Sequence, residues 1–258
     1  MIKRITEILR YHELIKNLIL RDLKVKYRGS FLGYLWSLID PLITMTIFIV
    51  IFSIIVRIEI KNYPIFLLSA ILPWRFFSDS VSRSSNSILG NTNLIKKIYF
   101  PRELFPLTEI LCHLINFFLS LFLLIPFIFM FHINISAKIA LLPFIMFLNF
   151  IFIYGLAMIF SSANVFFKDV GYITNFILSI WFYASPVFYS SGMVPKKFYS
   201  FYMLNPMAIF IDLYRSAILN LDFPGMFNII FLILISFLIF ILGIRFFIKN
   251  ERMMMKRI

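Results

Sequence analysis

Long apolar stretches recur along most of the chain and are separated by short segments that carry most of the charged residues. About 20 apolar residues in a helix are enough to cross the hydrocarbon core of a bilayer. The pattern predicts six spans, at about 35–56, 63–89, 104–131, 139–163, 170–189 and 226–247. The expected fold class is therefore an all-α integral membrane protein.

The first 28 residues follow a different pattern, because apolar residues at helical spacing alternate with lysines and arginines. This pattern predicts an amphipathic helix that lies on an anionic leaflet. A solvated basic tail is the alternative. The charges also interrupt any continuous apolar region of a cleavable signal peptide. Residues 1–34 are thus expected to be an interfacial segment, and 35–258 a membrane domain.

The second predicted span is apolar only as far as Trp74. Its other half contains Arg75, Asp79, Arg83 and several serines. A charge at membrane depth costs about 2.5–3.5 kcal/mol on insertion scales. This half is therefore expected to line a water-filled cavity or to pack inside an assembly. Arg75 and Asp79 stand four residues apart, so they either pair along one helix face or contact a substrate.

The segment between the last two spans, 190–222, does not read as a span. It contains lysines, several tyrosines and the pair Asn205-Pro206, and its amphipathic piece at 209–221 is interrupted by Asp212 and Arg215. That piece is too short and too charged to cross a bilayer. A pair of re-entrant or interfacial helices is expected here.

Composition and charge narrow the class of protein. The chain is 61% hydrophobic with a net charge of +13, against about 45–50% apolar residues in soluble domains, so neither a soluble globule nor a disordered chain fits. With six spans and both termini in the cytoplasm, most cations lie on the cytoplasmic side. The outer segments hold the remaining non-membrane cations, Arg57, Lys61, Lys138, Lys196 and Lys197. The positive charge then orients the spans and does not imply nucleic acid.

Signals for catalysis are missing from the sequence. The three histidines lie in different segments and the one cysteine, Cys112, is in an apolar stretch, so no metal site or disulfide is expected. There is no GxxxxGK[ST] motif, so no nucleotide site is expected on this chain, and no carboxylate pair outside the membrane suggests acid–base chemistry. We therefore expect no catalytic residues and no cofactor.

A polar membrane interior with many aromatic residues suits transport. Aromatic rings pack on sugar faces, and Tyr and Trp add a polar handle. Most of the 34 phenylalanines are expected to face lipid. The candidate channel residues are those beside polar or proline-broken sequence, namely Trp74, Arg75, Asp79, Trp181, Tyr183 and Tyr189.

Six segments in order carry a resemblance to a known family. They are RDLKVKYRGSFLGYLWSLIDPL at 21–42, LPWRFF at 72–77, NLIKKIYFPRELFPL at 93–107, FFKDV at 166–170, SPVFY at 185–189 and LNPM at 204–207. Together they resemble the membrane (permease) subunit of type 2 ABC exporters for bacterial surface polysaccharides, which include O-antigen, teichoic acid and capsule exporters. Asp40 departs from the asparagine expected in many relatives.

The resemblance implies a homodimer in the bacterial cytoplasmic (inner) membrane that moves a lipid-linked polysaccharide, with O-antigen as the first expectation. Two copies of a separate ABC ATPase would bind ATP and Mg. Residues 190–222 would form external gate helices, and the N-terminal helix an interfacial gate. The connection at 91–103 would be the coupling helix that docks the ATPase, with simple positive-inside anchoring as the alternative. Its candidate contact residues are Asn93, Lys96, Lys97, Phe100, Pro101, Arg102 and Glu103.

Three cations of the N-terminal segment, Lys24, Lys26 and Arg28, are placed to attract the phosphates of the lipid carrier. They could equally bind anionic headgroups of the membrane lipids. Two other functions stay open. One is export of teichoic acid, capsule, a drug or a lipid, and the other is a membrane enzyme that modifies lipid-linked sugars.

Overall fold

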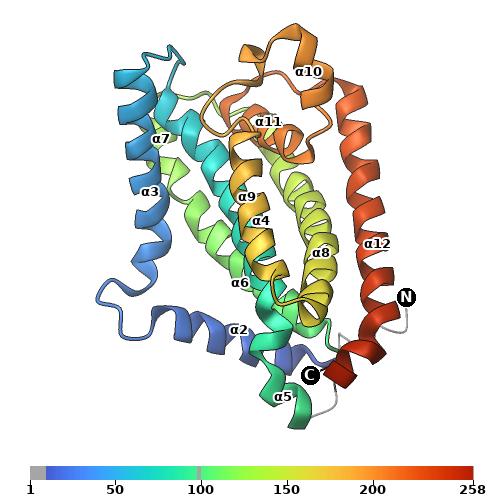
Figure 1. Cartoon of the computed structure of the whole chain (residues 1–258). Coiled ribbons are helices and arrows are strands. Elements are labelled where there is room, and N and C mark those ends of the chain that lie inside the picture. The colour runs from blue at the N-terminus through green and yellow to red at the C-terminus, as the bar shows by residue number, and fades with distance from the viewer. Residues whose placement is uncertain (1–9, 98–99, 258) are drawn as a thin grey trace.

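The computed structural model describes residues 10–97 and 100–257, and this part of the chain is helical without a strand. The long helices of this part of the chain stand side by side (Figure 1). They are α3 (Trp36–Phe48), α4 (Tyr63–Gly90), α6 (Leu104–Leu121), α8 (Leu142–Phe166), α9 (Val170–Tyr183) and α12 (Met226–Arg257). The predicted all-α class is confirmed.

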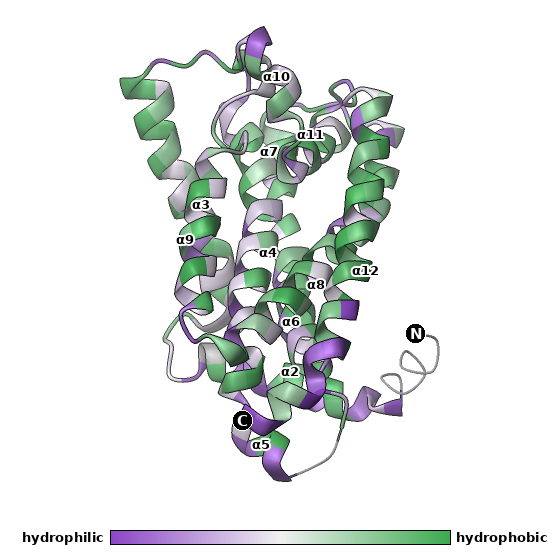
Figure 2. Ribbon diagram, turned by 45° about the vertical axis from the view of Figure 1, so that its right-hand side comes forward, coloured by the Kyte–Doolittle hydropathy of each residue, from purple (hydrophilic) through white to green (hydrophobic). Residues whose placement is uncertain are grey.

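Further helices close the two ends of this bundle. At one end, here called the basal end, α2 (His12–Tyr27) runs across the bundle, and α5 (Thr92–Lys97) and the C-terminal part of α12 lie beside it (Figure 1). At the opposite, apical end lie α10 (Lys196–Tyr202) and α11 (Pro206–Leu219). Hydrophilic residues gather at the basal end, while the upright helices are mostly hydrophobic (Figure 2).

Several predicted span boundaries agree with the ends of the helices, and others differ from them. The fifth helix ends at Tyr183 and not at 189, because Pro186 disfavours helical backbone at the residue before it. The last helix does not stop at 247 but runs through the basic tail to Arg257, where that side chain donates to the carbonyl of Phe166. The third span is divided into α6 and α7 (Leu124–Met130). Residues 1–9 of the predicted amphipathic helix lie outside the described residues.

Four segments of the described chain are long and apolar enough to cross a membrane. They are Gly33–Ile55, Leu104–Met130, Ala137–Phe166 and Met226–Arg257. Helix α4 is long enough to cross a membrane, but it is not apolar enough, because its basal half is polar. Helix α9 is apolar but has 14 residues, about 21 Å of helix against a hydrocarbon core of about 30 Å.

Helix α4 is the centre of the bundle, since it packs against α3, α6, α8, α9 and α11. Aromatic pairs join it to its neighbours. The rings of Phe76 and Phe117 of α6 stack with centroids 5.1 Å apart, and Phe77 meets Trp181 of α9 edge to face at 5.1 Å. The apical half of α4 is buried among apolar residues, so the charged residues are confined to the part nearer the basal end.

The crossing of α8 and α12 depends on two glycines. A Cβ atom on Gly155 would lie 2.6 Å from backbone atoms of Ile239, and one on Gly243 would overlap the carbonyl group of Gly155. The two backbones are therefore in direct contact, as in membrane helix pairs that meet through small residues.

Replacing Gly243 with alanine should push the two helices apart and lower the free energy of unfolding by about 1–3 kcal/mol. Unfolding in mixed detergent micelles by titration with a denaturing detergent would measure this loss. Gly90→Ala is the matched control, since nothing lies within 4 Å of its added Cβ. Equal stability of the two variants would contradict the close contact.

Candidate functional site

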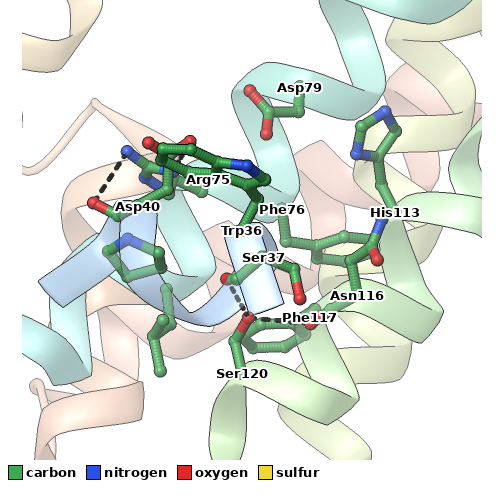
Figure 3. Close-up of a pocket in the computed structure, with 12 residues that line it drawn as sticks. Trp36, Ser37, Asp40, Arg75, Phe76, Asp79, His113, Asn116, Phe117 and Ser120 are labelled. Atoms are coloured by element: carbon green, nitrogen blue, oxygen red, sulfur yellow. Dashed lines mark hydrogen bonds and ion pairs between the residues drawn. The ribbon is translucent and has the colours of Figure 1, made fainter. Parts of the chain in front are cut away.

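A small polar chamber lies between α3, α4 and α6 (Figure 3). Arg75 and Asp79 enter it from α4, Asp40 from α3, and His113 and Asn116 from α6. Its volume is about 100 Å³, and a cavity of this kind with several polar partners can hold water. The polar half of α4 thus lines a cavity, one of the two arrangements expected for it.

The partner of Arg75 lies on another helix. One of its terminal nitrogens is 3.1 Å from a carboxylate oxygen of Asp40 (Figure 3). The other donates to the hydroxyl of Thr44 at 2.9 Å. The structure pairs Arg75 with Asp40 of α3, a residue that the sequence did not suggest as its partner. The ion pair fastens α3 to α4.

A second polar surface, the α4–α9 groove, has a volume of about 350 Å³. Its polar lining consists of Ser78, Asp79 and Ser82 of α4 with Asn175 and Ser179 of α9. The Ser82 hydroxyl donates to the Asn175 side-chain oxygen at 2.6 Å. Sequence reasoning missed both α9 residues, although their spacing of four within an apolar stretch places them on one helix face.

The four candidate aromatic residues do not share one surface. Trp74 is buried, with ring centroids 5.4 Å from both Phe77 and Phe182, and reaches the α4–α9 groove beside Tyr183, which is 68% exposed. Trp181 lines a separate, apolar groove against α10. The fourth residue, Tyr189, lies in the loop at 184–190. Of these four aromatic residues, only Trp74 and Tyr183 line the α4–α9 groove together with Asp79.

The loop at 184–190 is held by one buried arginine of α11. Arg215 is 2% exposed and donates to the carbonyls of Val187 at 2.8 Å and Tyr189 at 3.2 Å. Its guanidinium carbon lies 3.6 Å from the ring centroid of Phe66. In the sequence, Arg215 stands out only as an interruption of an apolar pattern. The spacing of three residues between Asp212 and Arg215 was the signal in the sequence for an ion pair on one helix face. In the structure, the charged atoms of the two side chains are 3.9 Å apart.

Neutral phenols add polar groups at the apical end. Tyr189 and Tyr202 lie near each other, with ring centroids 6.3 Å apart. Burial raises the pKa of both hydroxyl groups. Both phenols therefore stay protonated at physiological pH and can donate hydrogen bonds.

The predicted docking segment at 91–103 divides into two parts. Asn93, Lys96 and Lys97 of α5 are exposed at the basal end. After positions 98 and 99, which lie outside the described residues, the chain turns inward. Phe100 and Glu103 are buried and Pro101 is partly buried.

The inward part includes Arg102, whose side chain is 11% exposed and 3.1 Å from the carboxylate of Glu251 of α12. Arg102 thus fastens the start of α6 to the last helix. The sequence does not indicate this contact, because the two residues are 149 positions apart.

The cations proposed to attract phosphates line a hollow along α2. Lys24, Arg28 and Arg21 surround it together with Asn17, and its volume is about 680 Å³. The side chain of Lys26 lies outside the described part of the structure. Arg21, which sequence analysis did not single out, also donates to the Asn91 side chain at 3.0 Å. Helix α2 is thereby connected to the junction of α4 and α5.

A bundle of apolar helices with polar hollows along its central helix is typical of an integral membrane protein. In the described residues, no group of three His, Cys, Asp or Glu side chains could hold a metal ion. Residues 13–219 match the family described as ABC-2 type transporter. The chain belongs to this family, which confirms the resemblance inferred from its motifs.

Curated relatives cover most of the chain. An O-antigen export system permease protein RfbA of Klebsiella pneumoniae is 32% identical over 89% of this chain and 88% of the relative. The RfbA protein of Myxococcus xanthus is 32% identical over 84% of both chains. The polysialic acid transport protein KpsM of Escherichia coli is 22% identical over 84% of this chain and 88% of its own length.

Replacing Arg215 with lysine should loosen the apical loop, because an ammonium cannot reproduce the planar, two-carbonyl contact and the stacking on Phe66. We expect a loss of about 2 kcal/mol in the free energy of unfolding, the scale of hydrogen bonds to charged groups. Unfolding in detergent micelles measures it. Arg83→Lys, at an exposed position, is the matched control and should be near neutral. Equal stabilities would show that the Arg215 contacts contribute nothing.

Proposed function

We propose that the chain is the permease subunit of an ATP-driven exporter that moves a lipid-linked O-antigen polysaccharide across the bacterial cytoplasmic membrane. The observation that carries this proposal is the α4–α9 groove, a polar surface on an otherwise apolar bundle. Charged and hydroxyl side chains at membrane depth are costly against lipid. Such a groove would therefore face a hydrated path, and the RfbA relatives are named as permeases of O-antigen export systems.

Two copies of the chain would enclose the path. Each copy would contribute six spans, with α4 and α9 as the second and fifth, so that their polar faces meet water and not lipid. The short α9 would reach the outer surface through the loop at 184–190. Helices α10 and α11 would then form the external gate, and both termini would lie in the cytoplasm with the basic residues of α2, α5 and α12.

Energy would come from two copies of a separate ABC ATPase that bind ATP and Mg, so this chain has no catalytic role. The exposed lysines of α5, Lys96 and Lys97, support docking at this point. The lipid carrier would approach α2, where Lys24 and Arg28 line one hollow. Each surface cation adds about 1 kcal/mol of attraction to phosphate-bearing lipid. Anionic headgroups of the bilayer are the alternative occupants.

A second candidate is export of a capsule polysaccharide, which the KpsM relatives favour. Their identity is 21–22%, against 32–34% for the RfbA proteins. The O-antigen assignment is therefore the better supported of the two.

Cells that synthesise a lipid-linked O-antigen but lack their own exporter provide the test. Surface glycan should appear when this chain is produced with its ATPase, and should be absent with an ATPase variant that binds but cannot hydrolyse ATP. Glycan export with the inactive ATPase, or none with the active one, would refute the proposal. A new lipid-linked sugar formed by the isolated chain would indicate a membrane enzyme instead.

Reversing the charge of α5 with Lys96→Glu and Lys97→Glu should reduce co-purification of the ATPase by about tenfold, the scale of close charge pairs at interfaces. Affinity purification of the complex at low and high salt measures the effect. The matched control is Lys196→Glu with Lys197→Glu, an exposed lysine pair of α10 at the opposite end. An unchanged yield of ATPase with the α5 variant would remove α5 from the docking surface.

A further inference from the structure

We propose that the apical end of the chain binds an anionic phospholipid, with an acyl chain in the groove between α9 and α10 and the phosphate at Lys196 and Lys197. This groove, here called the α9–α10 groove, has a volume of about 580 Å³. The inference does not depend on which polymer is exported, because it requires only that the apical end lie at a membrane surface.

The wall of the α9–α10 groove is mostly apolar. Ile177, Ile180 and Ala184 line it from the end of α9, and Phe198 and Phe201 line it from α10. None of the described residues that line the groove carries a charge. A sugar would leave its hydroxyl groups without hydrogen-bond partners against such a wall, which is costly. Hydrocarbon carries no such cost.

Two polar side chains of the lining bond to each other and to the loop after α9. The Trp181 indole nitrogen donates to the Asn205 side-chain oxygen at 2.7 Å. The Asn205 amide donates to the carbonyl of Ala184 and to the Ser185 hydroxyl oxygen, both at 3.0 Å. An apolar ligand can therefore fill the groove without taking a bonding partner away from either side chain.

The apolar side chains of the groove are strongly exposed. Phe198 is 56% exposed, Phe201 79% and Ile180 55%. Exposed apolar surface of this kind marks contact with a membrane or a protein. The groove lies where α9 ends and α10 closes the apical end (Figure 1). In a bilayer that the upright helices span, this level is close to the lipid headgroups.

Two lysines at the edge of the groove favour an anionic lipid. Lys196 and Lys197 begin α10 and are exposed. The Lys197 ammonium lies 5.7 Å from the ring centroid of Phe198, which lines the groove. A lysine beside apolar surface can direct its charge to the headgroup region, where it attracts phosphate. The site therefore combines a hydrocarbon surface with a cationic edge.

The carboxylate of the neighbouring helix α11 has other partners. Asp212 accepts from the Ser191 hydroxyl at 2.6 Å and lies 3.9 Å from the Arg215 guanidinium. It is also absent from the lining of the groove. Asp212 is therefore not the counter-ion of the lysine pair.

A second copy of the chain is the other occupant to consider. A twofold interface uses the same surface on both subunits, so two copies that met groove against groove would bring their lysine pairs together. Repulsion between like charges opposes this contact. A phospholipid fits both parts of the site, with hydrocarbon for the groove and phosphate for the lysines. It would hold α10 against α9.

Quenching of Trp181 by brominated lipids tests the proposal. The full chain with Trp36→Phe and Trp74→Phe keeps Trp181 as its only tryptophan, and it is placed in nanodiscs of phosphatidylcholine. Phosphatidylglycerol or phosphatidylcholine with brominated acyl chains is then added in small proportions. We expect the phosphatidylglycerol to quench at the lower mole fraction. Lys196→Ala with Lys197→Ala should raise the mole fraction required about tenfold.

Two further variants separate the groove from the charge. Ala184→Phe fills the groove with both lysines in place and should reduce quenching by the phosphatidylglycerol. Lys249→Ala with Lys256→Ala removes two exposed lysines of α12 near the basal end and should leave quenching unchanged. Native mass spectrometry of the chain with all three tryptophans counts the phosphatidylglycerol retained with and without the α10 lysines. It decides the question if the single-tryptophan chain does not accumulate.

The outcomes distinguish the possible occupants. Equal quenching by both lipids that the loss of Lys196 and Lys197 does not change would indicate bulk lipid only and would overturn the proposal. No quenching by either lipid would overturn it as well, and cross-linking of two copies through Phe198→Cys would then assign the groove to a second copy. Neither result bears on the exporter assignment, which the surface-glycan experiment decides.

Discussion

The cost of placing charged and polar groups at membrane depth is the constraint on which the rest of the structure depends. Helix α4 carries Arg75 and Asp79 in the centre of an apolar bundle, so each polar group along it needs a partner or water. The partners come from three sides, with Asn175 of α9 accepting from the Ser82 hydroxyl. Asp40 meets Arg75 from α3. From α8, the Asn164 amide donates to the carbonyl of Ser85 at 3.0 Å and accepts from the backbone nitrogen of Gly171 at 2.9 Å. This requirement explains why α4 lies at the centre of the bundle. The polar side chains of α4 that the neighbouring helices do not cover line the chamber and the α4–α9 groove.

The same rule explains the apical end. Backbone that leaves the helical conformation inside or near a bilayer must find other partners for its carbonyl groups. In the loop after α9, three successive carbonyls are satisfied by side chains from distant elements. Arg215 donates hydrogen bonds to the carbonyl groups of Val187 and Tyr189. The Tyr63 hydroxyl donates to the carbonyl group of Phe188 at 2.8 Å. The hydrogen bonds of one buried arginine therefore replace part of the backbone hydrogen bonds that a helix would provide. The loop can then be ordered without secondary structure of its own.

Hydrophobic periodicity was sufficient to predict the helices, because each apolar stretch must be helical in a bilayer whatever it packs against. It also located the polar half of α4, since a charge within an apolar run is visible in any single sequence. It could not identify the partner of Arg75. Asp40 stands 35 residues away in the sequence, and only the tertiary arrangement brings it to Arg75. For the same reason the end of α9, the groove residues Asn175 and Ser179, and the anchoring role of Arg215 came from the structure. Each depends on contacts between segments that are far apart in the chain.

The basal end shows how a short docking segment can act on the whole bundle. If the ATPase docks on α5, its motion reaches more than the two helices that α5 connects. The Arg21 side chain joins the α4–α5 junction to α2 through Asn91, and Arg102 joins the start of α6 to α12 through Glu251. The second contact is an ion pair with side chains only 11% and 16% exposed, so salt screens it less than a surface pair. A displacement of α5 would therefore move the interfacial helix and the last helix together with α4 and α6. Such a linkage requires no flexible hinge in the docking segment, because polar contacts on either side of it transmit the displacement directly.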